Sequence, residues 1–185
     1  MKRLLLVYLM LCFVFPITIE AKKKPFGNGL CWELTSDGVL TISGTGYMPD
    51  FGYYKKEDWC PWHKKSTKIL RVVIEDGVKS IGENAFCSKD HLYNLQKIEI
   101  PSSIKYIGRA AFWRCRNLSA IVFPNSLDSI GLGAFEDCHA LTSIVIPNSV
   151  KVIGEAAFCD CINLTSVVIS NSLEEIKETT FSGCI

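Results

Sequence analysis

A 23-residue pattern repeats along the second half of the chain and constrains its fold more than any other feature. One copy occupies 141–163 (LTSIVIPNSVKVIGEAAFCDCIN), and others occupy 95–117, 118–140 and 164–185. A further copy at 69–94 carries three extra residues, in an insertion around 88–93. A fixed period of this length is typical of a solenoid, in which each unit buries its apolar face against its neighbours. The sequence therefore predicts five stacked repeats over 69–185.

Within each repeat, the spacing of apolar residues indicates which side chains face the core. It predicts two inward-facing pairs, Ile144 with Ile146 on a short strand and Val150 with Ile153 after a turn. Gly154 predicts a tight corner. The segment 155–158 that follows predicts a single helical turn, and its Phe158 supplies bulk to the core.

The repeat pattern L-x-x-I-x-I-P-x-S-V-x-x-I-G-x-x-A-F-x-x-C resembles the BspA-type leucine-rich repeats of exported proteins from host-associated bacteria and some protists. The segment 40–50 (LTISGTGYMPD), with Pro61 and Trp62 further on, resembles the N-terminal lead of the same family. The last repeat departs from the pattern, with Ser170 for proline, Lys177 for glycine and threonines at 179–180 for alanines. The resemblance implies a leucine-rich-repeat solenoid of the right-handed β/α superhelix type. It also implies export, binding of other macromolecules, and no shared catalytic residue.

The first 21 residues belong to a different class of sequence. Lys2 and Arg3 precede an apolar run over 4–15, and Ala21 closes the segment. This arrangement predicts a secretory signal peptide cleaved after Ala21. A retained membrane anchor is the alternative, but the run is shorter than the roughly 20 residues that span a bilayer. We expect a secreted or cell-surface protein with no membrane span in its mature chain.

Residues 22–68 precede the repeats and are predicted to cap them. A hairpin is expected over 30–43, because Asp37-Gly38 separates two alternating segments. An aromatic loop follows over 51–65. Because the first unit of a solenoid needs cover, we predict that Trp32, Trp59 and Trp62 pack over it. The alternative is that these aromatic side chains form a ligand platform.

Cysteines fall into two groups. Those that recur once per repeat are predicted to stack as buried free thiols in preference to disulfides: Cys115, Cys138, Cys161 and Cys184. A metal site is disfavoured, because the sequence lacks paired C-x-x-C units. Cys31 and Cys60 lie outside the repeats and are predicted to form a disulfide with each other.

Two candidate binding surfaces follow from the repeat. The residues that lie between the inward positions of each strand face outward, namely Val73, Glu99, Val122, Val145 and Val168. An exposed apolar stripe can mark a protein-binding surface, although β-branched residues also simply suit the face of a sheet. Trp113, Arg114 and Arg116 form a second candidate patch, because Trp and Arg are favoured at interfaces. Its alternative is an isolated exposed position.

The function predicted from these features is that of an exported, non-enzymatic recognition or adhesion module that binds protein through its strand face. A net charge of +1 leaves no basic excess for nucleic acid, and no cofactor is expected. Three alternatives stay open. The chain could be an assembly module docking through its last repeat, with Ile176 and Phe181 in a weak homodimer, or a remnant of a longer adhesin. It could also be an enzyme with a site in the 51–65 loop at His63.

Overall fold

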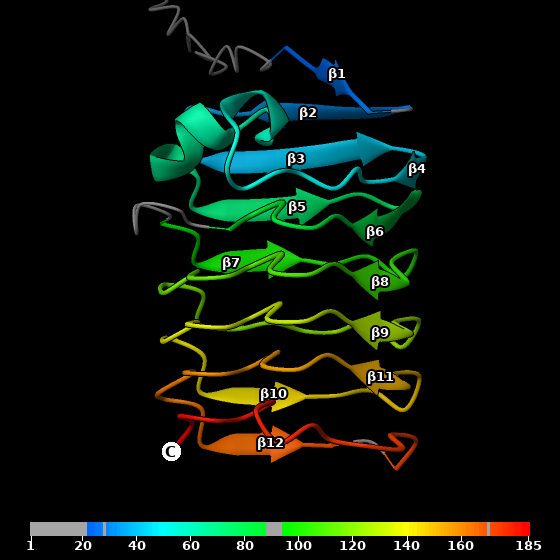
Figure 1. Ribbon diagram of the computed structural model, residues 1–185. Coiled ribbons are helices and arrows are strands. Elements are labelled where there is room, and N and C mark those ends of the chain that lie inside the picture. Colours follow the sequence, from blue (N-terminus) through cyan, green and yellow to red (C-terminus); the bar gives the residue numbers. More distant parts are fainter. Residues whose placement is uncertain (1–21, 28, 88–93, 170) are drawn as a thin grey trace, which may run out of the picture.

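A computed structural model of the chain describes residues 22–27, 29–87, 94–169 and 171–185 (Figure 1). The chain winds into coils stacked one below another, so that equivalent segments of successive repeats lie side by side. The predicted signal peptide and the 88–93 insertion lie outside the described residues. Within the described residues, no helix is long and apolar enough to cross a membrane.

One side of the solenoid is formed by the first strand of each coil, and we call it the strand face. Its strands below the N-terminal region are β5 (Arg71–Ile74), β7 (Lys97–Glu99), β10 (Ser143–Val145) and β12 (Ser166–Val168). They pair in parallel with a shift of one repeat, as in Ile144 opposite Val167. The third repeat keeps only a bridge between Lys97 and Ala120. The alternation predicted for these strands is confirmed, because Ile98 and Ile144 are buried while Val145 is exposed.

A second parallel sheet lies at the other end of each coil. Its strands are β4 (Gly46–Tyr47), β6 (Val78–Ile81), β8 (Tyr106–Ile107), β9 (Ser129–Ile130) and β11 (Val152–Ile153). They pair in the order β11-β9-β8-β6-β4. Val150 and Ile153 both point into the core, as predicted. The sequence predicted this inward pair but not that Ile153 belongs to a strand.

The turn segments 83–87, 109–113, 132–136, 155–159 and 178–182 form a further side, which we call the turn face. The helical turn predicted over 155–158 is wrong: the segment is a series of hydrogen-bonded turns, and Ala156 has a φ of 55°. That left-handed conformation interrupts a right-handed helix. The backbone instead bonds to the next coil, as when Phe112 N donates to Ala134 O at 2.8 Å.

Each of the first four turn segments is preceded by a corner glycine, which close backbone contact requires. A Cβ on Gly131 would lie 2.7 Å from the backbone N of Arg109 in the preceding coil. The next coil repeats this contact, because a Cβ on Gly154 would lie 2.4 Å from Leu132 N. The predicted corner is therefore present, and its cause is the spacing between coils.

A column of stacked aromatic rings runs through the core. It consists of Trp62, Phe86, Phe112, Phe135, Phe158 and Phe181, with centroid separations between 5.0 and 5.6 Å. Every ring above Phe181 is fully buried. The column thus stacks one core aromatic ring of each coil on that of the next.

The N-terminal region extends the stack of coils at the N-terminal end of the solenoid. Its strands are β1 (Lys24–Phe26), β2 (Leu30–Leu34) and β3 (Val39–Gly44), and 3-10 turns occupy η1 (Lys56–Asp58) and η2 (His63–Lys68). The predicted hairpin is present, with Leu34 opposite Leu40. Strand β3 pairs in parallel with β5, so it forms the strand of an additional coil. Trp32 and Trp62 are buried, whereas Trp59 is half-buried and donates its indole N–H to Tyr53 O at 3.2 Å.

The last coil is less regular than those above it. Lys177 stands where the earlier repeats have the corner glycine. At the equivalent Gly154, a Cβ would lie 2.4 Å from the backbone of the preceding coil. No strand forms at Ile176, which is exposed. Thr180 replaces an alanine and is buried, with no partner for its hydroxyl among the described residues. The last coil therefore presents apolar side chains that the upper coils bury.

Candidate functional site

The strand face divides into an apolar half and a charged half. Val122, Val145 and Val168 are 80%, 60% and 55% exposed, and Val145 lies opposite Val168 in the sheet. Val73 and Glu99, also predicted to face outward, are half-buried and lie opposite each other on β5 and β7. The five predicted residues thus share one face, and the three lower ones form a continuous exposed stripe.

The charged half of the strand face is centred on Glu99. Its carboxylate accepts a hydrogen bond from the Arg71 guanidinium and lies 3.2 Å from Lys97 Nζ. The hydrogen bond from Arg71, followed by that from Lys97, holds the pKa of Glu99 below its ordinary value. Because these side chains are partly exposed to water, the cluster contributes little to stability. It adds a net positive charge beside the valine stripe.

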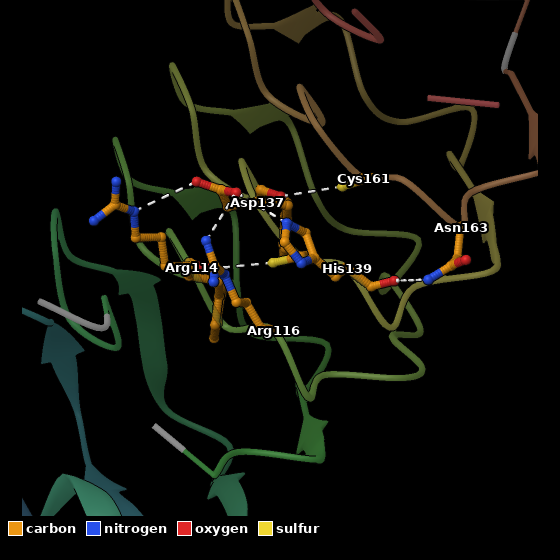
Figure 2. Close-up of polar contacts among 9 residues, drawn as sticks. Arg114, Arg116, Asp137, His139, Cys161 and Asn163 are labelled. Carbon is orange, nitrogen blue, oxygen red and sulfur yellow. Dashed lines mark hydrogen bonds and ion pairs between the residues drawn. The ribbon is translucent and has the colours of Figure 1, made fainter. Parts of the chain in front are cut away.

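The second predicted patch lies on the turn face, where its arginines converge on one carboxylate (Figure 2). Arg114 Nε lies 3.4 Å from Asp137 Oδ2, and Arg116 lies 3.5 Å from Asp137 Oδ1. His139 Nε2 lies 2.9 Å from the same Oδ1. The repeat explains this convergence, because Arg114 and Asp137 are one period apart and occupy the same position in adjacent coils. Both arginines are therefore paired with a carboxylate of the next coil.

Trp113 points into a pocket of about 420 Å³ between the turn face and the loop that begins at Phe51. The ring of Tyr53 meets the Trp113 ring at a tilted angle of 62° and a centroid distance of 5.2 Å. The Arg114 guanidinium also lies over the Trp113 ring, 4.2 Å from its centroid. Trp113 of the predicted patch is therefore in contact with the aromatic loop 51–65, although the two were predicted as separate features.

Hydrogen bonds hold the loop in place above the pocket. The backbone N–H of Phe51 donates to Glu83 O at 2.9 Å, and Asn84 Nδ2 donates to Phe51 O at 2.8 Å. Asp50 accepts from Glu83 N at 2.8 Å. These bonds follow the pattern of coil-to-coil contacts on the turn face, so the loop takes the place of a turn segment above Glu83.

Sequence reasoning missed the polar lining of this pocket, which includes Glu83, Arg109 and Glu136. Burial, followed by the charge of Asp137, raises the pKa of Glu136 above its ordinary value. The indole N–H of Trp113 lies beside Glu136 and has no partner in hydrogen-bond geometry among the described residues. Glu83 and Arg109 occupy equivalent positions in successive repeats, directly after the corner glycine, and Glu136 lies one period after Trp113. The repeat spacing could therefore have grouped these residues.

The recurring cysteines are free thiols, as predicted, and three of them are buried, whereas Cys184 in the last coil is half-buried. Each bonds to the aromatic column. Their S–H groups donate to the carbonyl of the phenylalanine in the preceding coil at 3.2 Å, namely Cys115 to Phe86, Cys138 to Phe112, Cys161 to Phe135 and Cys184 to Phe158. Burial raises the pKa of Cys115 and Cys138, and it raises that of Cys161 to about 12. Thiols held in this way are poor nucleophiles.

The disulfide predicted between Cys31 and Cys60 is not formed in this structure, where both are free thiols. Leu30 and Trp32 point into the core from β2, so Cys31 between them points to the other face of the strand. Cys60 is buried on the core side. Among the described residues, no group of His, Cys, Asp or Glu could hold a metal ion. His63, the candidate for an enzymatic site, packs its ring against Trp59 at 4.0 Å.

Comparison with solved structures identifies several similar bacterial proteins. A leucine-rich repeat protein of T. pallidum is 30% identical, with a TM-score of 0.58 over 79% of this chain and 71% of that protein. A leucine-rich repeat protein of Eubacterium ventriosum is 32% identical, with a TM-score of 0.60 over 79% of this chain and 43% of that protein. A leucine rich cell surface protein of Faecalibacterium prausnitzii is 26% identical, with a TM-score of 0.62 over 88% of this chain and 46% of that protein. The chain therefore spans less than half the length of the last two.

The repeats themselves match a defined family. The model of the BspA type leucine rich repeat region matches residues 63–185 in six copies. Among curated proteins, no match was found. The match covers well over half of the sequence and includes every repeat that the 23-residue period predicts. The chain therefore belongs to the BspA-type leucine-rich repeat family.

Proposed function

We propose that this protein is an exported recognition module that binds another protein through the valine stripe of its strand face. Leucine-rich repeat proteins of this family are generally interaction modules at surfaces. One observation carries the proposal: Val122, Val145 and Val168 lie exposed on three successive coils. Contiguous exposed apolar side chains on a rigid frame are typical of protein-binding surfaces.

The chemistry of the strand face also indicates the kind of partner. The stripe would bury apolar side chains, while Arg71 and Lys97 beside Glu99 would favour a partner with acidic residues at the rim. A surface of only a few coils buries limited area, so we expect weak single-site binding that gains strength from multivalent display.

The stripe can be tested with a matched pair of variants. Val145→Glu places a charge in the stripe, whereas Val152→Glu places one on the second sheet at a residue of nearly equal exposure, 60% against 59%. Both variants and the wild type are tested by biolayer interferometry on a panel of immobilised extracellular matrix and serum proteins. We expect a protein of the panel to bind the wild type and Val152→Glu but not Val145→Glu. Unchanged binding by a folded Val145→Glu variant would contradict the proposal.

Export is the second part of the proposal and rests on the apolar segment that precedes Lys22. A protein released through a secretory pathway would begin at Lys22 after cleavage behind Ala21. Mass spectrometry of the exported protein would measure this terminus directly. Retention of segment 1–15 in a membrane fraction would support the anchor instead.

A second candidate function is docking through the last coil, favoured by its exposed apolar side chains. Ile169 and Ile176 are exposed, and Phe181 ends the aromatic column half-buried. Strand β12 pairs only with β10 within the described residues, so one of its edges is open to another strand. Light scattering over a concentration series would detect a homodimer, and Ile176→Lys should dissociate it. A constant monomer mass would exclude self-association through this coil.

A further inference from the structure

The pocket on the turn face is built from residues that the proposed protein-binding function does not use. It is lined by Tyr53, Tyr54 and Trp113 together with the polar residues Glu83, Asn84, Arg109 and Glu136. Its volume of about 420 Å³ lies within the range of small-molecule sites, which is roughly 300–1,000 Å³. It lies on a different side of the coils from the valine stripe, so it could act independently of it.

The aromatic rings offer apolar surface at the edge of the pocket. Tyr54 is 88% exposed, and its ring stands at 89° to that of Tyr53. Tyr53 in turn meets Trp113, so rings from the loop and from the second repeat form one connected group. Exposed Tyr and Trp side chains supply contact area at a small cost in conformational entropy, together with polar ends.

The polar groups around these rings include both hydrogen-bond donors and acceptors. Within the described parts of the chain, the Glu83 carboxylate and the Arg109 guanidinium form no hydrogen bond or ion pair with a side chain. Asn84 uses its amide N–H to hold Phe51, which leaves its carbonyl oxygen as an acceptor. Two carboxylates, one guanidinium and one amide therefore surround the rings.

This combination of aromatic rings and charged groups limits the kinds of ligand that the pocket can bind. The lining carries charges of both signs. Arg109 would repel a cationic ligand, and Glu83 and Glu136 would repel an anionic one. A neutral ligand with hydroxyl groups would donate to the carboxylates and accept from the guanidinium. Its apolar C–H surface would lie against the aromatic rings. A sugar ring has both features.

We propose that the turn-face pocket binds a neutral pyranose sugar, with its ring against Tyr54 and Trp113 and its hydroxyl groups on Glu83, Arg109 and Glu136. The frame suits this role because hydrogen bonds join Phe51 of the loop to Glu83 and Asn84 of the first repeat. A site held in this way needs little ordering when the ligand binds.

Saturation-transfer NMR with the full protein tests this proposal. The probes are the methyl glycosides of glucose, galactose, mannose and N-acetylglucosamine at roughly 10 mM, because a ligand of this size binds in the millimolar range. We expect at least one glycoside to receive saturation. Tyr54→Ala removes an exposed ring without touching the core and should weaken its binding by about fivefold or more. Tyr106→Ala, which removes an exposed tyrosine from β8, is the matched control and should leave binding unchanged.

Three results would overturn the proposal. These are the absence of saturation transfer to every glycoside, equal loss in Tyr54→Ala and Tyr106→Ala, and tighter binding of tetramethylammonium than of any glycoside. The last result would assign the pocket to a cation. The strand-face variant Val145→Glu should retain sugar binding, so failure of the pocket and failure of the strand face are distinguishable.

Discussion

The phenyl ring of Phe112 lies flat against that of Phe135, with centroids 5.0 Å apart and ring planes 7° apart. The same contact recurs between Phe135 and Phe158, at 5.3 Å and 5°. Because each ring belongs to a different coil, the contact couples neighbouring repeats rather than residues within one repeat. The solenoid therefore depends on an aromatic column as well as on its two sheets.

Truncating the column at its centre should destabilise the whole stack. Phe135→Ala leaves a cavity between two buried rings and should lower the free energy of unfolding by about 3–5 kcal/mol. Phe135→Leu keeps most of the volume and should cost clearly less. Urea denaturation followed by circular dichroism measures both. A cost below about 1 kcal/mol for Phe135→Ala would mean that the column does not couple the coils.

The effect of substituting the corner glycine Gly131 can be compared with that of substituting Gly133, which lies two residues later. A methyl group on Gly131 would press on the backbone of Arg109 and Gly108, so Gly131→Ala should destabilise by about 1–3 kcal/mol. Gly133 has a φ of 58°, but the equivalent residue of the next coil is Ala156 with a φ of 55°. A Cβ at Gly133 would meet only the end of the flexible Glu136 side chain, at 2.9 Å, and no backbone atom. Gly133→Ala should therefore carry the strain of its positive φ but cost less than Gly131→Ala. Melting temperatures of the two variants decide this, and equal losses would contradict the role of close approach.

Much of this architecture could be predicted from the 23-residue period. The period placed Ile144 inside and Val145 outside correctly, because alternation along a strand and stacking between repeats constrain each other. The cysteines that recur once per repeat are free thiols, as the repeat register predicts. The turn after Gly154 was assigned wrongly, because Glu-Ala-Ala-Phe has high helical propensity and tertiary hydrogen bonds outweigh that propensity here.

The candidate sites were less predictable than the fold. The contact between Tyr53 and Trp113 joins a loop without repeat register to a repeat position, and no sequence spacing indicates it. The Arg114–Asp137 pair, in contrast, could have been predicted from the sequence, because the two residues are one period apart. The predicted disulfide between Cys31 and Cys60 is not formed in the structure. Both residues lie outside the repeats, and that position alone does not indicate to which side of β2 a cysteine points.

Buried thiols should make stability fall at alkaline pH. The pKa of Cys161 is raised from an ordinary value near 9 to about 12 in the folded protein, chiefly by burial. Below pH 9 the thiol is protonated in both states, and above it the unfolded chain loses the proton first. Its contribution to stability is therefore lost as pH rises from about 9 to about 12. Urea midpoints at pH 8 and pH 10.5 should differ more for the wild type than for Cys161→Ala, and equal differences would refute this.

Asp137 should control the ionisation of its neighbour on the turn face. Burial is the largest cause that raises the pKa of Glu136, and the negative charge of Asp137 is the second. Arg114 lowers the pKa of Glu136. Asp137→Asn removes the repulsion and releases Arg114, so the pKa of Glu136 should fall towards its ordinary value. Carboxyl-carbon NMR titration measures the change directly. Asp160→Asn is the control and should give a smaller shift, because Asp160 is a weaker cause.

In the proposed function, the exposed valines of the strand face make the contact with a partner protein. Hydrogen–deuterium exchange of the protein, alone and with the partner selected from the extracellular panel, measures this contact most directly. We predict new protection at 121–123, 144–146 and 167–169, the strand segments that present Val122, Val145 and Val168. Protection confined to the turn face at 109–113, or to the last coil at 171–185, with unchanged exchange along the valine stripe, would contradict the claim.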